Sequence, residues 1–176
     1  MTNYSVYNNI GNPLYTQLTN TYAAPGVEAL PASDAAKNGS LFVLNSGSIA
    51  LSAGQSILQQ IANPSAGTKT FYISSVSGGG TAAATVTLYS GGTISGGTTT
   101  PFNMRLGSAN ASAATARQNT GTLGGTPASF LTVPVTAGQY TISLGGSVVV
   151  SANQTFSVTI GPGAATASLA IIWWEV

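Results

Sequence analysis

Few side chains in this chain of 176 residues could carry out chemistry. It contains no histidine and no cysteine, so it lacks the base of a Ser-His-Asp triad, a thiolate nucleophile, and His or Cys metal ligands. The charged side chains are Glu28, Asp34, Lys37, Lys69, Arg105, Arg117 and Glu175. Two carboxylates precede the predicted body and the third adjoins the carboxyl terminus, which disfavours a catalytic pair or a calcium site. We therefore expect no enzymatic activity, no cofactor and no metal.

Two of the basic residues, Arg105 and Arg117, are isolated charges within a weakly apolar region and have no acidic neighbour in sequence. One interpretation is a solvated strand face. The other is a subunit contact, with Glu175 or the terminal carboxylate of a neighbouring copy as the partner, because arginine is favoured at protein interfaces.

A glycine triplet, Gly78-Gly79-Gly80, could suggest a phosphate-binding loop. No lysine follows at the spacing of such a loop, and no helix is predicted after it. We therefore expect a hairpin turn at this triplet.

The composition as a whole is nearly uncharged. Charged residues make up 4% of the chain and the formal net charge is +1, whereas an ordinary soluble domain has roughly 25% charged residues. With no basic patch, nucleic-acid binding is not expected. Because 43% of the residues are hydrophobic, the sequence predicts a folded domain with a surface prone to association.

The amino-terminal segment has neither a basic region nor an apolar run typical of a secretory signal. No uninterrupted apolar stretch is long enough to span a bilayer, so membrane insertion is not expected. A surface-type composition without a leader suggests assembly onto a spore inside the mother cell, or into a virion inside an infected cell. We therefore expect a location outside the cell or on its surface.

Short apolar runs alternate with turn signals through most of the chain, which predicts an all-β domain. Period-two alternation places one set of side chains inward and a hydroxyl-rich set outward. The expected strands fall at 41–45, 49–52, 57–61, 71–76, 85–89, 102–106, 114–120, 140–144, 148–150, 155–160 and 167–176. This number of strands fits an antiparallel jelly-roll β-sandwich, and a seven-stranded immunoglobulin-like sandwich is the alternative.

The last expected strand, 167–176, is apolar on both faces and contains Trp173 and Trp174. Such a strand is either central in a two-layer core or covered by a neighbouring molecule. A position at the outer edge of a sheet favours the second interpretation, in which both tryptophans belong to an assembly interface.

Residues 1–37 differ in composition from the body, which we place at 38–176. They are rich in tyrosine and asparagine and contain Pro25 and Pro31, so we expect an extended arm and linker. An arm of this kind can add a strand to the sheet of a neighbouring copy. Its candidate anchors are Tyr4, Tyr7, Leu14, Tyr15 and Leu18.

Five stretches carry a resemblance to known proteins: Asn63-Pro64-Ser65 with Lys69 and Phe71-Tyr72-Ile73, then 85–89, 107–110, 156–160, and Trp173-Trp174-Glu175. In these the chain resembles a group of small uncharacterised β-sandwich surface proteins of spore-forming Gram-positive bacteria and their phages. In texture it is also similar to spore-surface jelly-roll domains and to endospore appendage subunits, which polymerise through a flexible amino-terminal connector. The chain departs from these by lacking collagen-like repeats and connector cysteines.

Composition, arm and resemblance together predict a structural subunit that self-assembles into an extracellular filament or appendage through arm strand addition. The alternative is a fibre head of a phage or spore surface, a trimeric module that binds a receptor or a carbohydrate. Oligomeric state separates the two, because open-ended polymers fit the first and a discrete trimer fits the second.

Overall fold

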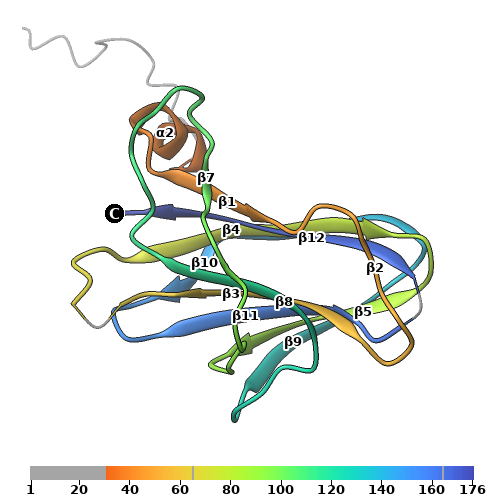
Figure 1. Cartoon of the computed structure of the whole chain (residues 1–176). Coiled ribbons are helices and arrows are strands. Elements are labelled where there is room, and N and C mark those ends of the chain that lie inside the picture. The colour runs from red at the N-terminus through yellow and green to blue at the C-terminus, as the bar shows by residue number, and fades with distance from the viewer. Residues whose placement is uncertain (1–30, 65, 164) are drawn as a thin grey trace, which may run out of the picture.

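The computed structural model of the chain describes residues 31–64, 66–163 and 165–176. Two antiparallel sheets lie one over the other and form a sandwich, with a short helix at one end (Figure 1). The expectation of an all-β domain with antiparallel sheets is therefore confirmed.

The first sheet has six strands in the order β10-β4-β12-β1-β7, with β2 paired to β12. Their bounds are β1 Leu41–Asn45, β2 Ile49–Ala50, β4 Phe71–Gly80, β7 Phe102–Asn103, β10 Gly138–Val150 and β12 Thr166–Glu175. The register places Ile171 of β12 opposite Leu44 of β1 and opposite Val76 of β4. The strand that contains the tryptophans is therefore central in its sheet.

The second sheet also has six strands, in the order β6-β8-β3-β11-β5-β9. Their bounds are β3 Ser56–Ala62, β5 Ala84–Ser90, β6 Thr98–Thr99, β8 Thr115–Gly121, β9 Ala128–Val135 and β11 Thr155–Gly161. Its central strand β11 places Val158 between Gln59 of β3 and Leu88 of β5.

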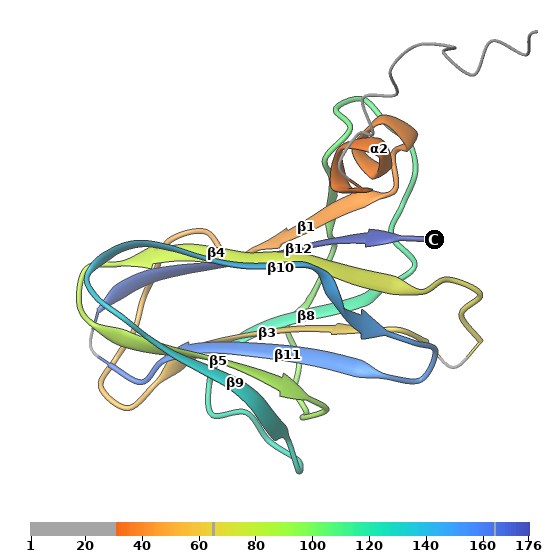
Figure 2. The ribbon, with the colours of Figure 1, turned by 180° about the vertical axis from the view of Figure 1, so that it is seen from behind.

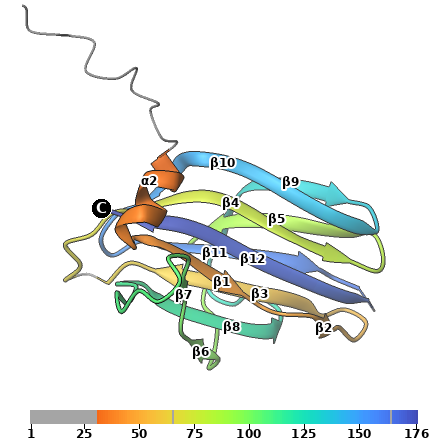
Figure 3. The same ribbon diagram turned by 90° about the horizontal axis from the view of Figure 1, so that it is seen from above.

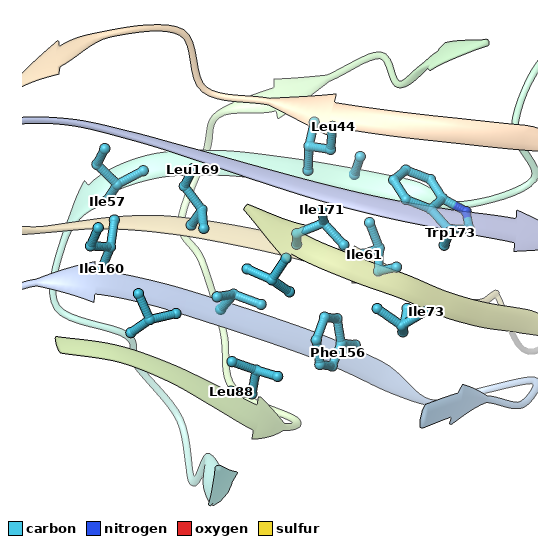
Figure 4. Packing of buried hydrophobic residues seen from close by; sticks show 14 of the residues in the cluster. Leu44, Ile57, Ile61, Ile73, Leu88, Phe156, Ile160, Leu169, Ile171 and Trp173 are labelled. Atoms are coloured by element: carbon cyan, nitrogen blue, oxygen red, sulfur yellow. The ribbon is translucent and has the colours of Figure 1, made fainter. Parts of the chain in front are cut away.

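Apolar side chains from both sheets fill the space between them (Figure 4). Leu44, Leu169, Ile171 and Trp173 of the first sheet meet Ile57, Ile61, Leu88, Phe156 and Ile160 of the second. These residues occur at alternate positions of their strands, so the period-two pattern of the sequence directs them inward. Burial of this set is the main favourable contribution to folding.

A short helix, α2 (Pro31–Asn38), precedes β1 and lies where an extended linker was expected. Pro31 suits the first helical position, and Gly39 ends the helix with a φ of 69°. The amide of Ser40 donates to the carbonyl of Ala35 at 2.9 Å, which closes the helix end. The predicted arm and linker at 1–37 thus gives way to helix from residue 31, and residues 1–30 lie outside the described part of the chain.

Other segments also differ from the sequence expectation: the strand expected at 102–106 is limited to β7 at Phe102–Asn103, and β6 at Thr98–Thr99 was not expected. Gly78-Gly79-Gly80 is the end of β4 and not a turn, because strands pair with it on both sides. Residues 140–144 and 148–150 form one strand, β10, with an irregularity between Ser143 and Val148. The strand β9 was not predicted at all, since Pro127 and Pro134 obscure its alternation.

Candidate assembly surface

The nine residues predicted to form an assembly interface do not come together in one place. Five of them, Tyr4, Tyr7, Leu14, Tyr15 and Leu18, lie outside the described residues. The other four, Arg105, Arg117, Trp173 and Trp174, belong to three separate parts of the body.

The two tryptophans are covered by their own chain. Trp173 is buried between the sheets and lies close to Phe42, with ring centroids 6.1 Å apart. Trp174 points to the other face, where it stacks on Tyr72 at 5.6 Å and is covered by α2 through Ala35. Because β12 is central and α2 covers its outer face, neither ring is left for a neighbouring molecule to cover. This corrects the expectation that Trp173 and Trp174 belong to an assembly interface.

The carboxylate of Glu175 is also engaged within its own chain. It accepts hydrogen bonds from the Ser112 hydroxyl at 2.5 Å, from the Ala113 amide at 3.0 Å and from the Trp173 indole N–H at 3.1 Å. The side chain is buried, so these donors replace the water that a charged carboxylate requires. Glu175 therefore links the segment around Ser112 to β12 through hydrogen bonds, and its buried carboxylate is not accessible to an arginine of another copy.

The two arginines occupy different environments. Arg117 lies in β8 opposite Gln60 and Thr98, and its guanidinium donates to the carbonyl of Ile94 at 3.5 Å. Arg105 lies in an exposed loop, where its amide donates to the Asn103 side chain at 2.9 Å. Arg117 thus helps to hold the 94–98 segment, and Arg105 is the more accessible of the two.

One side of the sandwich exposes part of its core, and the sequence analysis did not identify it. The edge strand β10 of the first sheet and the edge strand β9 of the second both lie on this side (Figure 2). Both are the last strands of their sheets there among the residues that the structure describes. Six apolar side chains on them pack against the core yet stay partly exposed: Leu131, Val135, Tyr140, Ile142, Leu144 and Val148. We call β9, β10 and these side chains the open flank.

On the opposite side, the chain passes directly from β6 at the edge of the second sheet to β7 at the edge of the first, and so covers that side. The segment that follows β5 passes over the second sheet, where Ile94 is buried. Its carbonyls accept hydrogen bonds from buried polar side chains, Gly92 from Gln60 at 3.0 Å and Gly91 from Ser157 at 2.7 Å. The two sides of the sandwich therefore differ in how far the chain covers them.

The open flank carries no charge. No charged residue occurs between Gln118 and Trp174, a range that contains β9 and β10 entirely. Natural proteins usually place lysines or other charges on exposed edge strands to prevent strand-to-strand association. On these two strands the devices present are Pro134 of β9 and the irregularities in the strand pairing of β9 and β10. The alternation of Leu131, Val133 and Val135 is the sequence signal that could have identified this edge.

Three exposed apolar side chains form a second feature, on the covered side. Phe102, Met104 and Leu106 are 61%, 41% and 80% exposed, and they occupy alternate positions of β7 and the loop after it. We call these three residues the apolar row.

The described residues contain no group of three or more Asp, Glu, His or Cys side chains that could hold a metal ion. None of the helices in the described ranges is long and apolar enough to cross a membrane. Comparisons of the chain with protein-family models, with curated proteins and with solved structures found no match.

Proposed function

We propose that the chain is a structural, non-catalytic subunit that self-assembles into an extracellular filament or appendage. The observation that carries the proposal is the open flank, where an uncharged edge strand of each sheet lies on the same side of the sandwich and six core side chains are partly exposed. Covering this flank removes apolar area from water at about 25 cal/mol per Å². A second copy of the chain can supply that cover.

The strand order supports a jelly roll as the fold of this subunit. The first sheet contains β1, β4, β10 and β12, and the second contains β3, β5, β9 and β11. Most pairs of these strands that follow one another in the chain therefore lie in different sheets. A double-sheet jelly roll is one of the architectures that antiparallel proteins use to limit exposed edges. In this chain the edge at β9 and β10 is left for an intermolecular contact.

The predicted arm starts in a suitable place for strand addition. Helix α2, which begins at Pro31, shares an apolar cluster with Trp174 of β12, and Tyr72 of β4 stacks on Trp174. Tyr72 pairs with Val149 of β10, so this cluster extends to the strand next to the open flank. We propose that residues 1–30 of one copy add a strand along β10 of a neighbour, where backbone hydrogen bonds give affinity and alternate side chains give register.

The surface composition agrees with a durable extracellular structure. Four basic residues in the whole chain leave few cleavage positions for trypsin-like proteases. We propose a spore or cell surface as the location, with a virion as the alternative. The relation to spore and phage surface proteins rests on the sequence resemblance alone.

Electron microscopy of the full-length chain beside a variant that lacks residues 1–22 tests this function. Regular fibres from the full-length chain, and folded, dispersed particles from the truncated one, are the expected result. If both proteins remain discrete oligomers of one size, the filament is excluded. A discrete trimer in that case would favour the receptor- or carbohydrate-binding head, and a glycan-binding screen would follow.

A further inference from the structure

The large exposed apolar side chains of the body are distributed over two opposite sides. Apart from Val176 at the carboxyl terminus, they are Phe102, Met104 and Leu106 in the apolar row, and Phe130 and Val149 on the open flank. In the first sheet, β7 and β10 are the two outermost strands of the order β10-β4-β12-β1-β7. Figure 3 shows β7 and β10 on opposite sides of the sandwich.

The apolar row is held in place by hydrogen bonds. The Asn103 side chain donates to the carbonyls of Gly39 and Asn110, at 2.9 and 3.0 Å. The Met104 amide donates to the carbonyl of Leu41 at 2.9 Å. Phe102, Met104 and Leu106 are therefore exposed on an anchored segment, which lowers the entropic cost of binding through them.

The open flank contains a small recess at one end. It has a volume of about 100 Å³, and its apolar lining includes Phe130, Val148, Val149 and Phe156. Phe130 lies against Phe156, with ring centroids 6.2 Å apart, and is 50% exposed. Val149 is 48% exposed at the rim. The recess can take an aliphatic side chain of a partner without burying a charge.

We infer that the apolar row of one copy docks on the open flank of the next copy, around the recess lined by Phe130 and Val149. This inference rests on the proposed function and specifies its partner and contact. Because the two surfaces differ and lie on opposite sides, the contact is head-to-tail. A head-to-tail contact that does not close into a ring produces an open-ended filament.

Charge is the reason to choose a second copy as the occupant. A typical protein surface would bring charged side chains against an uncharged flank, and each would lose hydration without gaining a partner. The apolar row contributes phenylalanine, methionine and leucine. Its one nearby charge, Arg105, lies between Met104 and Leu106 in the loop after β7, and its aliphatic chain approaches Gly39 of its own body.

Three full-length variants with the same added charge test the contact by sedimentation velocity. Leu106→Lys places the charge in the apolar row, Val149→Lys places it at the rim of the recess, and Ala53→Lys places it in an exposed turn away from both surfaces. At a concentration where the unmodified chain polymerises, Leu106→Lys and Val149→Lys alone should sediment as monomers of 17.5 kDa. Ala53→Lys should polymerise like the unmodified chain.

Mixing the two defective variants gives the decisive observation. Leu106→Lys retains an intact flank and Val149→Lys retains an intact row, so an equimolar mixture should form dimers and stop there. Circular dichroism and thermal melts unchanged from the unmodified chain establish that each variant is folded. Polymers from either variant alone, or only monomers in the mixture, would overturn the head-to-tail contact. If the unmodified chain stays monomeric at every concentration, the proposed function fails instead.

Discussion

Tyr140 of β10 lies directly opposite Gly78 of β4 and reaches across it to the next strand. Its hydroxyl donates a hydrogen bond of 3.1 Å to the carbonyl of Ser168 in β12. A β-carbon at Gly78 would lie 2.6 Å from that hydroxyl oxygen and 2.1 Å from the Ser168 carbonyl oxygen. The absence of a side chain at Gly78 therefore lets one tyrosine join three adjacent strands, which is a recognised use of glycine inside a sheet.

Gly78→Ala should destabilise the fold, because the added methyl group would collide with backbone and with the Tyr140 hydroxyl. We expect the free energy of unfolding to fall by about 1–3 kcal/mol, the usual cost of overpacking. Urea denaturation measures this. Gly163→Ala is the matched control, since nothing lies within 4 Å of a β-carbon there. Equal stability of the two variants would contradict the close approach of Tyr140 to Gly78.

Tyr140 should also make stability depend on alkaline pH. Burial raises the pKa of Tyr140 above its ordinary value of 10.0. The Tyr140 hydroxyl therefore loses its proton at a lower pH in the unfolded chain than in the folded chain. The contribution of Tyr140 to stability is complete below about pH 10 and is lost as the pH rises further. Tyr140→Phe should show a smaller fall in Tm between about pH 9 and about pH 11. Parallel profiles for both proteins would show that Tyr140 ionises equally in the two states.

Glu175→Gln should be destabilising although it is isosteric. The carboxylate accepts three hydrogen bonds from Ser112, Ala113 and Trp173, and an amide presents an N–H₂ group to one or more of these donors. A buried donor left without an acceptor costs about 1–3 kcal/mol. Asp34→Asn removes the same charge from an exposed position of α2 and should cost no more than about 1 kcal/mol. A Glu175 variant as stable as the Asp34 variant in urea would contradict the role of Glu175.

Assembly itself should be nearly indifferent to salt. The open flank has no charged residue within 118–174, and the apolar row contributes uncharged side chains. Screening by salt acts on charge pairs, so a contact without them does not weaken as ionic strength rises. We expect the concentration at which polymers form to be the same or lower at about 1 M NaCl than at about 0.05 M. Light scattering over a dilution series measures this, and dissolution of polymers by salt would indicate an ionic contact instead.

Much of the strand content follows from local sequence. The alternation of Phe156, Val158 and Ile160 with hydroxyl residues predicts both the strand and its buried face, and β11 has that geometry. Such patterns are reliable because successive side chains of a strand must point to opposite faces. The near absence of charge and the lack of histidine and cysteine are likewise properties of the sequence alone.

The neighbours of each strand were decided by the tertiary structure. Local pattern did not reveal that β12 lies between β1 and β4, that α2 covers Trp174, or that Glu175 is bound by Ser112 and Ala113. The glycines at 78–80 are a turn by composition, yet strands on both sides hold them in β4. The open flank likewise exists only because sheet order leaves β9 and β10 at the same side. The sequence determined which residues prefer burial, and long-range pairing decided what covers them, because strand pairing joins residues that are far apart in the chain.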